Sequence, residues 1–290
     1  MNKILYNLSK FIPDKIYLQL LYYKHFHRFI DFKNPKTFNE KINWLKLHNH
    51  KPEYTQMVDK FAVREYIAER IGEEYLIPIL GVWDDPCKID FDRLPNRFVL
   101  KWNHDSGSVV ICKDKAKLNI PETVAMLASK KNHNGYWYGR EWPYKNVKPL
   151  IIAEQYMTDT PESNDFTDYK FFCFNGYVDC VMICMERSSG DTKFYFFDKD
   201  WTLKRLNKRG KEAPDDFTVD KPECIDEMFR IAQILSKDLP FIRVDLYQSC
   251  GRIYFGELTF FPDSGLDANL LPETDKYFGN LIDLTLCKYK

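Results

Sequence analysis

The stretch that decides the fold is Ile242-Arg243-Val244-Asp245-Leu246-Tyr247, followed four residues later by Arg252-Ile253-Tyr254-Phe255-Gly256-Glu257-Leu258-Thr259. Apolar and polar residues alternate in both segments, which predicts two strands joined by a tight turn at Ser249-Cys250-Gly251. Two strands this close in sequence pair most simply as an antiparallel hairpin. The sequence therefore predicts a sheet near the end of the chain.

The alternation also predicts which polar side chains share a face of this hairpin. Arg243 and Asp245 lie on one face of the first strand. By the same rule, Phe255, Glu257 and Thr259 lie on one face of the second strand. Two carboxylates and an arginine side by side on a sheet suit a hard cation such as Mg²⁺, which retains several of its waters. A solvated sheet face with a surface salt bridge explains the same residues equally well.

Composition excludes several classes of protein. Lys+Arg and Asp+Glu each number 42 among the 290 residues, so the net charge is zero. Because no basic block stands out, we expect no nucleic-acid partner. The eight cysteines include no CxxC pair, the N-terminus lacks a signal-peptide core, and no apolar run approaches the roughly 18 residues of a membrane span. We therefore expect a cytoplasmic protein with reduced thiols and no transmembrane segment.

One segment, residues 16–30, has two interpretations. It mixes leucines and aromatic residues with Lys24, Arg28 and two histidines. A basic amphipathic helix of this kind can lie on the inner face of a membrane as a peripheral contact. A helix packed on its own domain is the alternative, and we favour it.

Local signals predict helices in the N-terminal third of the chain. Thr37 and Glu40 form a capping box, so a helix begins at Phe38 and ends near Asn49. Apolar spacing predicts one continuous helix over residues 55–71.

Further along the chain, strands outnumber helices. Strands are expected at 76–82, 97–102, 109–113, 150–157, 169–174, 177–186 and 193–198, and helices at 121–130 and 224–236. The aromatic-rich residues 132–148 lack periodicity and predict a loop or lid. Together the pattern predicts an α+β or α/β protein with largely antiparallel sheets.

The first of four further motifs is a strand that ends in a lysine and enters a small polar loop. Phe98-Val99-Leu100-Lys101 is followed by Asn103-His104-Asp105-Ser106-Gly107-Ser108. Backbone N–H groups of such a loop can cradle phosphates while the lysine supplies charge, and Gly107 allows close approach. A plain hairpin loop is equally consistent with these residues.

The other three motifs carry less information individually. Glu154 ends an apolar strand, which suits an adenine slot, although an ordinary strand end explains it better. Asp168 and Lys170 share one strand face, where they can serve a ribose and a phosphate or simply form a charge pair. Lys60 lies on the helix predicted over 55–71, where a lysine is usually exposed to solvent.

In this order, the motifs resemble the ATP-grasp superfamily, and D-alanine–D-alanine ligases are recognisable from Lys60 to Thr259. The amino-acid sequence of these motifs is more similar to the TupA-like ATP-grasp family, which is associated with teichuronopeptide and capsular polysaccharide gene clusters. The segments that carry the resemblance are Lys36-Thr37-Phe38-Asn39-Glu40-Lys41-Ile42, Asp59-Lys60-Phe61-Ala62-Val63-Arg64-Glu65-Tyr66, Arg140-Glu141-Trp142-Pro143-Tyr144, Asp168-Tyr169-Lys170-Phe171-Phe172 and Tyr254-Phe255-Gly256-Glu257-Leu258-Thr259-Phe260. The resemblance covers most of the chain, from about Asn34 to about Gly265.

The resemblance implies an α+β (α/β) ATP-grasp fold, in which two lobes clasp a nucleotide, with ATP and Mg²⁺ as cofactors. It divides the chain into an N-terminal helical segment (1–54), an N-terminal lobe with the phosphate loop and a possible lid (55–153), and a C-terminal lobe with the Mg²⁺ site (154–290). The residues implied to contact the nucleotide are Lys60, Lys101, Ser106, Gly107, Ser108, Glu154, Met157, Asp168 and Lys170.

The same resemblance implies a metal site and catalytic residues. Asp245, Glu257 and Thr259 are the implied metal ligands, with Glu257 bridging two ions. Arg243 and Lys101 are the implied catalytic residues, because they stabilise the transferring phosphoryl group. Many ATP-grasp enzymes carry an asparagine where this chain has Thr259, and a hydroxyl is a weaker ligand, which puts the second ion in doubt.

The implied activity is ATP-dependent ligation of a carboxylate to an amine through an acyl phosphate, with ADP and phosphate as products. The expected substrates are a uronic-acid carboxylate of a bacterial capsular or cell-surface polysaccharide, or its precursor, and an amino acid or amino alcohol. A sugar or polysaccharide kinase with the same nucleotide site is the alternative. A nucleotide-binding module without catalysis would not need Lys101, Arg243, Asp245 and Glu257 together.

The aromatic stretch suggests an acceptor site. Its candidates are Arg140, Trp142, Tyr144 and Lys145, because flat rings stack on sugars and cations hold carboxylates. A structural loop packed by aromatic rings is an equally weighted alternative. The sequence identifies neither the carboxylate nor the amine, and it does not define the oligomeric state.

Overall fold

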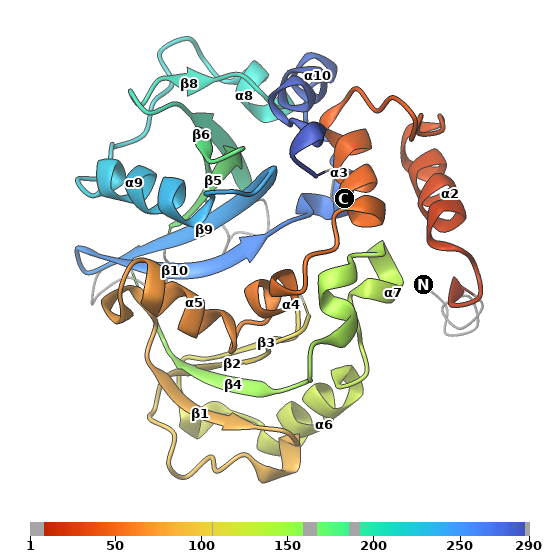
Figure 1. Ribbon diagram of the computed structural model, residues 1–290. Coiled ribbons are helices and arrows are strands. Elements are labelled where there is room, and N and C mark those ends of the chain that lie inside the picture. The colour runs from red at the N-terminus through yellow and green to blue at the C-terminus, as the bar shows by residue number, and fades with distance from the viewer. Residues whose placement is uncertain (1–8, 106, 159–166, 186–191, 288–290) are drawn as a thin grey trace. The chain divides into compact units, whose positions relative to one another are not determined.

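The computed structural model describes residues 9–105, 107–158, 167–185 and 192–287. The chain divides into two compact units, each containing one antiparallel sheet (Figure 1). Unit 1 comprises Met1–His50 and Asp159–Lys290, and unit 2 comprises Lys51–Thr158. Up to His50, the segment expected at 1–54 therefore belongs to the same unit as the C-terminal part of the chain.

Unit 2 contains a four-stranded sheet of order β1-β4-β2-β3. Its strands are β1 (Ile79–Trp83), β2 (Phe98–Trp102), β3 (Val109–Cys112) and β4 (Ile151–Gln155). Its α-helices are α4 (Glu53–Val58), α5 (Val63–Arg70), α6 (Ile120–Lys130) and α7 (Tyr136–Gly139). Short 3₁₀ turns are η1 (Glu73–Tyr75), η2 (Pro86–Lys88), η3 (Lys115–Lys117) and η4 (Trp142–Asn146).

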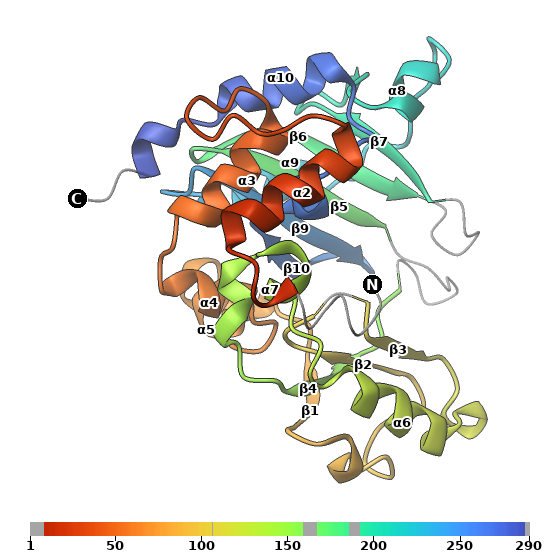
Figure 2. The ribbon, with the colours of Figure 1, turned by 90° about the vertical axis from the view of Figure 1, so that its right-hand side faces the viewer.

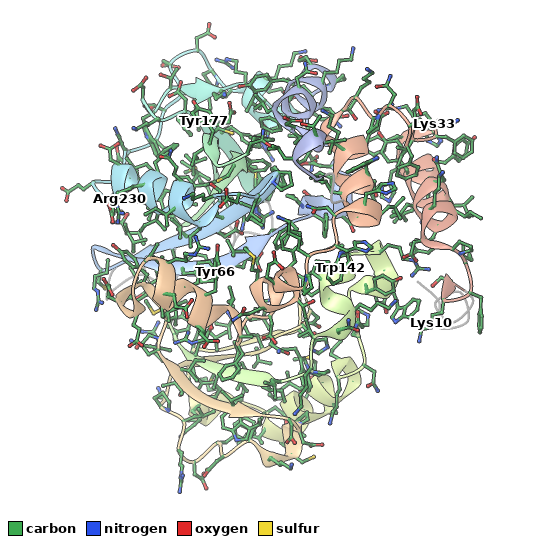
Figure 3. The ribbon with its side chains drawn as sticks, in the orientation of Figure 1. Lys10, Lys33, Tyr66, Trp142, Tyr177 and Arg230 are labelled. Carbon is green, nitrogen blue, oxygen red and sulfur yellow. The ribbon has the colours of Figure 1, made fainter. Side chains whose placement is uncertain are left out.

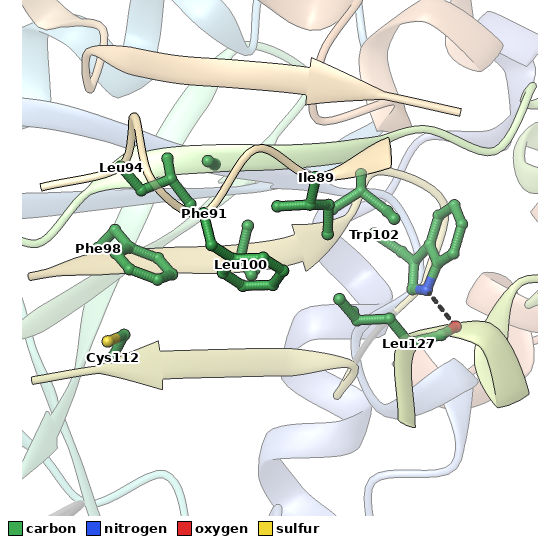
Figure 4. Packing of buried hydrophobic residues seen from close by; sticks show 10 residues of the cluster. Ile89, Phe91, Leu94, Phe98, Leu100, Trp102, Cys112 and Leu127 are labelled. Atoms are coloured by element: carbon green, nitrogen blue, oxygen red, sulfur yellow. Dashed lines mark hydrogen bonds between the residues drawn. The ribbon is translucent and has the colours of Figure 1, made fainter. Parts of the chain in front are cut away.

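The core of unit 2 follows from the alternation along β2. Phe98, Leu100 and Trp102 are fully buried, whereas Lys101 is on the other face of the strand. The indole Nε1 of Trp102 donates to the carbonyl of Leu127 on α6 at 3.0 Å, so the buried polar atom is satisfied (Figure 4). This packing leaves the Lys101 side of the sheet available for polar groups.

Unit 1 contains a six-stranded sheet of order β10-β9-β5-β6-β7-β8. Its strands are β5 (Asp168–Phe174), β6 (Tyr177–Met185), β7 (Lys193–Phe197), β8 (Leu203–Lys204), β9 (Phe241–Ser249) and β10 (Arg252–Thr259). Its helices and 3₁₀ turns are α2 (Asp14–Phe26), α3 (Phe38–His48), α8 (Lys208–Glu212), α9 (Ile225–Leu235), η6 (Pro262–Gly265), α10 (Pro272–Leu281) and η7 (Leu284–Cys287).

Helices cover both faces of this sheet (Figures 1 and 2). Phe171 of β5 packs edge-on against Phe229 of α9, with ring centroids 5.1 Å apart. Its neighbour Phe172 points to the opposite face and stacks on Phe278 of α10 at 5.5 Å. Phe38 of α3 joins the same cluster through Phe278 at 5.7 Å. The period-two alternation of β5 thus separates two hydrophobic layers.

Several expected elements are confirmed. The capping box is present, with both the Thr37 and the Glu40 side chains bonded to backbone N–H groups, and α3 ends at His48. The hairpin of β9 and β10 is present, and so is the largely antiparallel character of both sheets.

The continuous helix expected over 55–71 is wrong. α4 ends at Val58 and α5 begins at Val63, with Lys60 in the turn between them. The side chain of Asp59 accepts the backbone N–H groups of Phe61 at 2.8 Å and Ala62 at 3.1 Å, and its own ψ is 110°. An aspartate that satisfies local N–H groups in this way competes with the helix.

The expectation of an irregular loop at 132–148 also needs correction. Two short helical elements, α7 and η4, form there and are joined at Arg140, whose φ of 55° is left-handed. The Asn134 side chain donates to the carbonyls of Tyr144 (3.1 Å) and Lys145 (3.3 Å), which ties the two ends of the segment together.

The expected alternation along β10 fails at Gly256. The register shifts between Phe255 and Glu257, so Phe255 lies opposite Leu246 and Glu257 lies opposite Asp245. Phe255 therefore faces the core and Glu257 shares a face with Asp245, instead of both lying on one side. A Cβ at Gly256 would lie 2.8 Å from the ring of Tyr247, so the bulge requires glycine there.

Candidate active site

The polar cluster of unit 1 is set by the registers of three adjacent strands. Lys170 of β5 lies opposite Asp245 of β9, which in turn lies opposite Glu257 of β10. Thr259 lies opposite Arg243 two pairs further along, on the same face of the sheet. The Gly256 bulge completes the cluster, because without it Glu257 would point to the other face.

Asp245 is the centre of this cluster and is only 1% exposed. Arg243 holds it with two hydrogen bonds, from Nε to Oδ1 and from Nη2 to Oδ2, each 2.7 Å long. Lys170 Nζ contacts the same carboxylate and also lies 2.6 Å from Oδ2 of Asp168. Each buried carboxylate is therefore paired with a cation, as burial of charge requires.

The charges of the cluster are strongly coupled. Burial alone would lower the pKa of Lys170, but the carboxylates of Asp245 and Asp168 outweigh it and raise the pKa above its ordinary value. Burial likewise opposes the charge of Arg243, and its bonds to Asp245 raise the pKa of the guanidinium. Both side chains are therefore cationic over the whole physiological pH range.

Glu257 and Thr259 form the more accessible edge of the cluster. The Glu257 side chain is 36% exposed, compared with 12% for Arg243. Arg243 Nη2 donates to Glu257 Oε1 at 3.2 Å and to Thr259 Oγ1 at 3.1 Å, and the Thr259 hydroxyl donates to Glu257 Oε1 at 3.1 Å. Arg243 thus contacts the side chains of Asp245, Glu257 and Thr259 together.

This donor set fits Mg²⁺ better than a cation that needs an all-protein cage. Across the described parts of the chain, no cluster of three His, Cys, Asp or Glu side chains could hold a metal by itself. Mg²⁺ is typically held by one or two carboxylates together with waters and substrate phosphates. Glu257 and Asp245 supply two carboxylates, and the Thr259 hydroxyl supplies a further oxygen. Both Asp245 oxygens already accept hydrogen bonds from Arg243, so metal binding by Asp245 would replace or share one of them.

In unit 2, Lys101 and Glu154 form a second charged group. Lys101 lies opposite Ile152 and Glu154 opposite Val99, which places the two side chains diagonally on one face of the β2–β4 pair. Their Nζ–Oε2 distance is 2.7 Å, and the side chains are 17% and 9% exposed. A lysine held this way has a defined position and a compensated charge.

The loop after β2 holds Lys60. Lys60 Nζ donates to the carbonyl of Asp105 at 2.7 Å, and its backbone N–H bonds to the carbonyl of Asn103 at 3.2 Å. Ser108 Oγ donates to the Asp105 carboxylate. Gly107 has a φ of 97°, and a Cβ there would meet no atom within 4 Å, so its left-handed backbone explains the glycine. Ser106 lies outside the described residues.

One predicted residue, Met157, and one residue without a predicted role, His104, lie near these groups in sequence. Met157 is buried just beyond the end of β4, where adenine contacts are predicted. His104 was not predicted to have a role, yet its ring is 1% exposed and neither ring nitrogen has a hydrogen-bond partner among the described residues. Burial lowers the pKa of His104, so its ring is neutral at pH 7.

The predicted acceptor residues differ in exposure. Arg140 is 1% exposed and packs over the rings of Tyr136 and Trp137, with its guanidinium carbon 5.5 and 5.2 Å from their centroids. Lys145 is exposed, with Nζ 4.8 Å from the Tyr136 centroid. Trp142, labelled in Figure 3, and Tyr144 are partly exposed in η4. Arg140 therefore organises the aromatic rings, and the role of the group in acceptor binding stays a prediction.

Sequence analysis missed a strained turn that follows β10. Asp263, Ser264 and Gly265 have φ values of 45°, 55° and 62°, a left-handed turn that is unfavourable for residues other than glycine. α3 holds it from one side: Lys46 Nζ donates to the Ser264 carbonyl at 2.7 Å, and Asn43 Nδ2 to the Gly265 carbonyl at 2.8 Å. Buried polar residues at i and i+3 of the predicted helix were the available signal.

Sequence comparison identifies the class of protein to which this arrangement belongs. The model of the TupA-like ATP-grasp family matches residues 40–283, and the chain therefore belongs to this family. Membership confirms the expected ATP-grasp fold and the expected class of enzyme, an ATP-grasp ligase, and agrees with ATP and Mg²⁺ as cofactors. No protein with a curated description matches the chain.

Solved structures similar to the chain include two D-alanine–D-alanine ligases and a D-cycloserine synthetase. The D-alanine–D-alanine ligase from Helicobacter pylori is 14% identical with a TM-score of 0.44, covering 85% of this chain and 69% of that one. The D-alanine–D-alanine ligase from Bacillus anthracis complexed with ATP is 15% identical with a TM-score of 0.46, covering 87% and 66%. D-cycloserine synthetase DcsG is 14% identical with a TM-score of 0.43, covering 79% and 70%. This chain thus spans about two thirds of the length of each, and none of these likenesses assigns a residue role.

Proposed function

We propose that the protein is an ATP-dependent carboxylate–amine ligase that joins an amino acid or amino alcohol to a uronic-acid carboxylate of a bacterial surface polysaccharide or its precursor. Membership of the TupA-like family supports the uronic-acid substrate, because the resemblance links that family to teichuronopeptide and capsular polysaccharide. When bound, ATP supplies the phosphoryl group that activates the carboxylate as an acyl phosphate, and attack by the amine gives the amide, ADP and phosphate.

The observation that carries the proposal is the cluster of Arg243, Asp245, Glu257 and Thr259 with Lys170. Phosphoryl transfer is catalysed mainly by positioning and by compensation of negative charge. Arg243 is already aimed by Asp245, so its guanidinium requires little reorganisation to face a transferring phosphoryl group. Glu257, as the most accessible carboxylate of the cluster, is the main proposed Mg²⁺ ligand, with Asp245 and Thr259 beside it.

We assign the nucleotide contacts to the remaining residues as follows. Lys101, held by Glu154, supplies a positive charge for the phosphates, and Lys60 does the same beside the loop that contains Gly107 and Ser108. Adenine contacts fall to Glu154 and Met157, and ribose contacts to Asp168. These roles follow the family pattern and are consistent with the burial and pairing of each side chain in its own unit.

The experiment that tests the proposal follows ADP and free phosphate together. Purified protein with ATP and Mg²⁺ is offered uronic-acid derivatives in combination with amino acids or amino alcohols. A ligase releases ADP and phosphate in equal amounts, and only when carboxylate and amine are both present. Release of ADP with a phosphorylated sugar and no free phosphate would instead establish the kinase.

A matched pair of variants connects this assay to the cluster. Glu257→Gln should lower kcat by about 100-fold or more, because it removes the carboxylate proposed to hold the Mg²⁺ that would compensate the negative charge of the transferring phosphoryl group. Glu227→Gln is the matched control, because Glu227 lies on α9 of the same unit and forms an ion pair with Arg230. This variant should change kcat by less than about twofold. Equal activity of the two variants would contradict the assignment of the cluster.

A further inference from the structure

Helix α2 has apolar side chains on two opposite sides. Leu18 and Tyr22 are fully buried and pack with Ile30 and Phe32. Ile16, Leu20 and Tyr23 are 53%, 54% and 46% exposed. At about 100° per residue, the spacing 16, 20 and 23 places these three side chains on one side, roughly opposite 18 and 22. The helix therefore packs on its unit with one side and presents a second apolar side to solvent.

Phe11, just before α2, and Phe29, just after it, are also exposed. They are 87% and 62% exposed, and the Phe29 ring stacks on Tyr23 with centroids 4.9 Å apart. We call Phe11, Ile16, Leu20, Tyr23 and Phe29 the α2 patch. Thirteen large apolar side chains are exposed in the described parts of the chain, and five of them lie within residues 11–29. Such a concentration marks an interaction surface, whereas scattered exposed apolar residues need no explanation.

The residues around the α2 patch are mainly cationic, although the whole chain is neutral. Exposed lysines lie beside it at positions 10, 24 and 33, whereas Lys15 lies toward the packed side of α2, with Nζ 5.9 Å from the Phe32 ring centroid. Figure 3 shows Lys10 and Lys33 projecting on the outer side of α2. The acidic residues between positions 10 and 33 are Asp14, in the first turn of α2, and Asp31, which accepts the backbone N–H groups of Lys33 and Asn34.

Among the described residues of unit 1, the outer side of α2 faces away from the six-stranded sheet (Figures 1 and 2). In Figures 1 and 2, α3 lies between α2 and the six-stranded sheet. Among the described residues, no helix has the length and apolar character needed to cross a bilayer. Any membrane contact of the described part of the chain is therefore a contact at the surface.

We propose that the α2 patch docks this protein on the surface of an anionic lipid bilayer. The apolar side chains would enter the boundary between headgroups and acyl chains, and the lysines would reach anionic headgroups. Charge argues against a second copy as the occupant, because a two-fold contact brings the same lysines of both copies together. The inference goes beyond the proposed ligation and does not depend on it.

Co-sedimentation of the full chain with lipid vesicles tests the proposal. The protein should bind vesicles of equal parts phosphatidylglycerol and phosphatidylcholine, and binding should weaken as salt is raised. Vesicles of phosphatidylcholine alone should bind much less. Lys24→Gln combined with Lys33→Gln should weaken binding to anionic vesicles about 25-fold, at about fivefold for each lysine.

The apolar part of the patch is tested separately. Leu20→Ser combined with Phe29→Ser should weaken binding at least about tenfold. Tyr177→Ser is the matched control, because Tyr177 is 64% exposed at the start of β6 in the same unit, and it should bind like the wild type.

Three results would overturn the proposal. The first is equal binding to anionic and neutral vesicles, and the second is equal binding by the patch variants and the Tyr177 control. The third is dimerisation without vesicle binding, lost in the Leu20/Phe29 variant, which would assign the patch to a second copy. The lysine variants change only exposed side chains, so they keep the test valid if the apolar double variant fails to fold.

Discussion

Replacement of Lys170 by methionine tests whether the charged cluster is one coupled unit. The lysine side chain is 12% exposed and lies between Asp168 and Asp245, each 1% exposed. Methionine fills similar space but leaves two buried carboxylates with Arg243 as the remaining cation among the contacts described for this cluster. Removing one partner of a buried ion pair typically costs about 3–5 kcal/mol, because the other charge stays buried without compensation.

Hydrogen exchange is the most direct measurement of this loss. A loss of about 3 kcal/mol corresponds to a fall of about 150-fold in the protection of β5 and β9 amides. Amides of β2 and β4, in the other unit, serve as an internal reference. Lys204→Met is the matched control, because the Lys204–Asp179 pair at β8 has a lysine side chain that is 22% exposed, and its loss should cost less.

The pH dependence sharpens the prediction. Because the folded pKa of Lys170 is raised, its stabilisation is fully present below the unfolded lysine value of about 10.4 and is lost only as the pH rises through the folded pKa. The difference between wild type and Lys170→Met should therefore be constant from about pH 6 to 9.

The result that refutes this reasoning is a small loss of protection. A loss below about 1 kcal/mol is what an exposed ion pair contributes, and it would show that the cluster is solvated and not coupled. Adding Asp168→Asn to Lys170→Met should restore part of the protection, since it removes one of the uncompensated charges. Failure of this rescue would locate the loss in packing instead of charge.

Three further predictions concern the backbone around the candidate site. Gly256→Ala should lower kcat at least about tenfold with the fold retained, because a Cβ 2.8 Å from the Tyr247 ring displaces the bulge that turns Glu257 toward Asp245; an unchanged kcat in steady-state assays would refute this. Gly107→Ala should raise the KM for ATP several-fold, because the φ of 97° at this position costs alanine about 1–2 kcal/mol. Gly251→Ala is the control: Gly251 also has a positive φ but lies in the β9–β10 turn, so this variant should leave the KM for ATP unchanged. Lys46→Met should lower kcat in the ligation assay by more than the accompanying fall in melting temperature would explain, because the carbonyl of Ser264 in the strained turn loses the hydrogen bond from Lys46. Lys46→Arg should restore part of the activity. A wild-type kcat for Lys46→Met would show that the turn keeps its conformation without this hydrogen bond.

The sequence by itself determined the parts that depend on local periodicity and local chemistry. The capping box of Thr37 and Glu40, the β9–β10 hairpin and the shared face of Asp168 and Lys170 all follow from residue types at fixed spacings. The ATP-grasp fold was also predicted, because its motifs occur in a recognisable order and the family match confirms it. These features require no knowledge of distant contacts.

Only the tertiary structure decided which side chains are paired and how the local rules fail. The bulge at Gly256 depends on the partner strand, the break at Asp59 involves a hydrogen bond from Asn103 to its carboxylate, and the left-handed turn at 263–265 is held by α3, more than 200 residues away in sequence. Periodicity predicts the direction of a side chain only while the backbone stays regular. The site lies where contacts distant in sequence make the backbone irregular, so its geometry could not be derived from the sequence pattern.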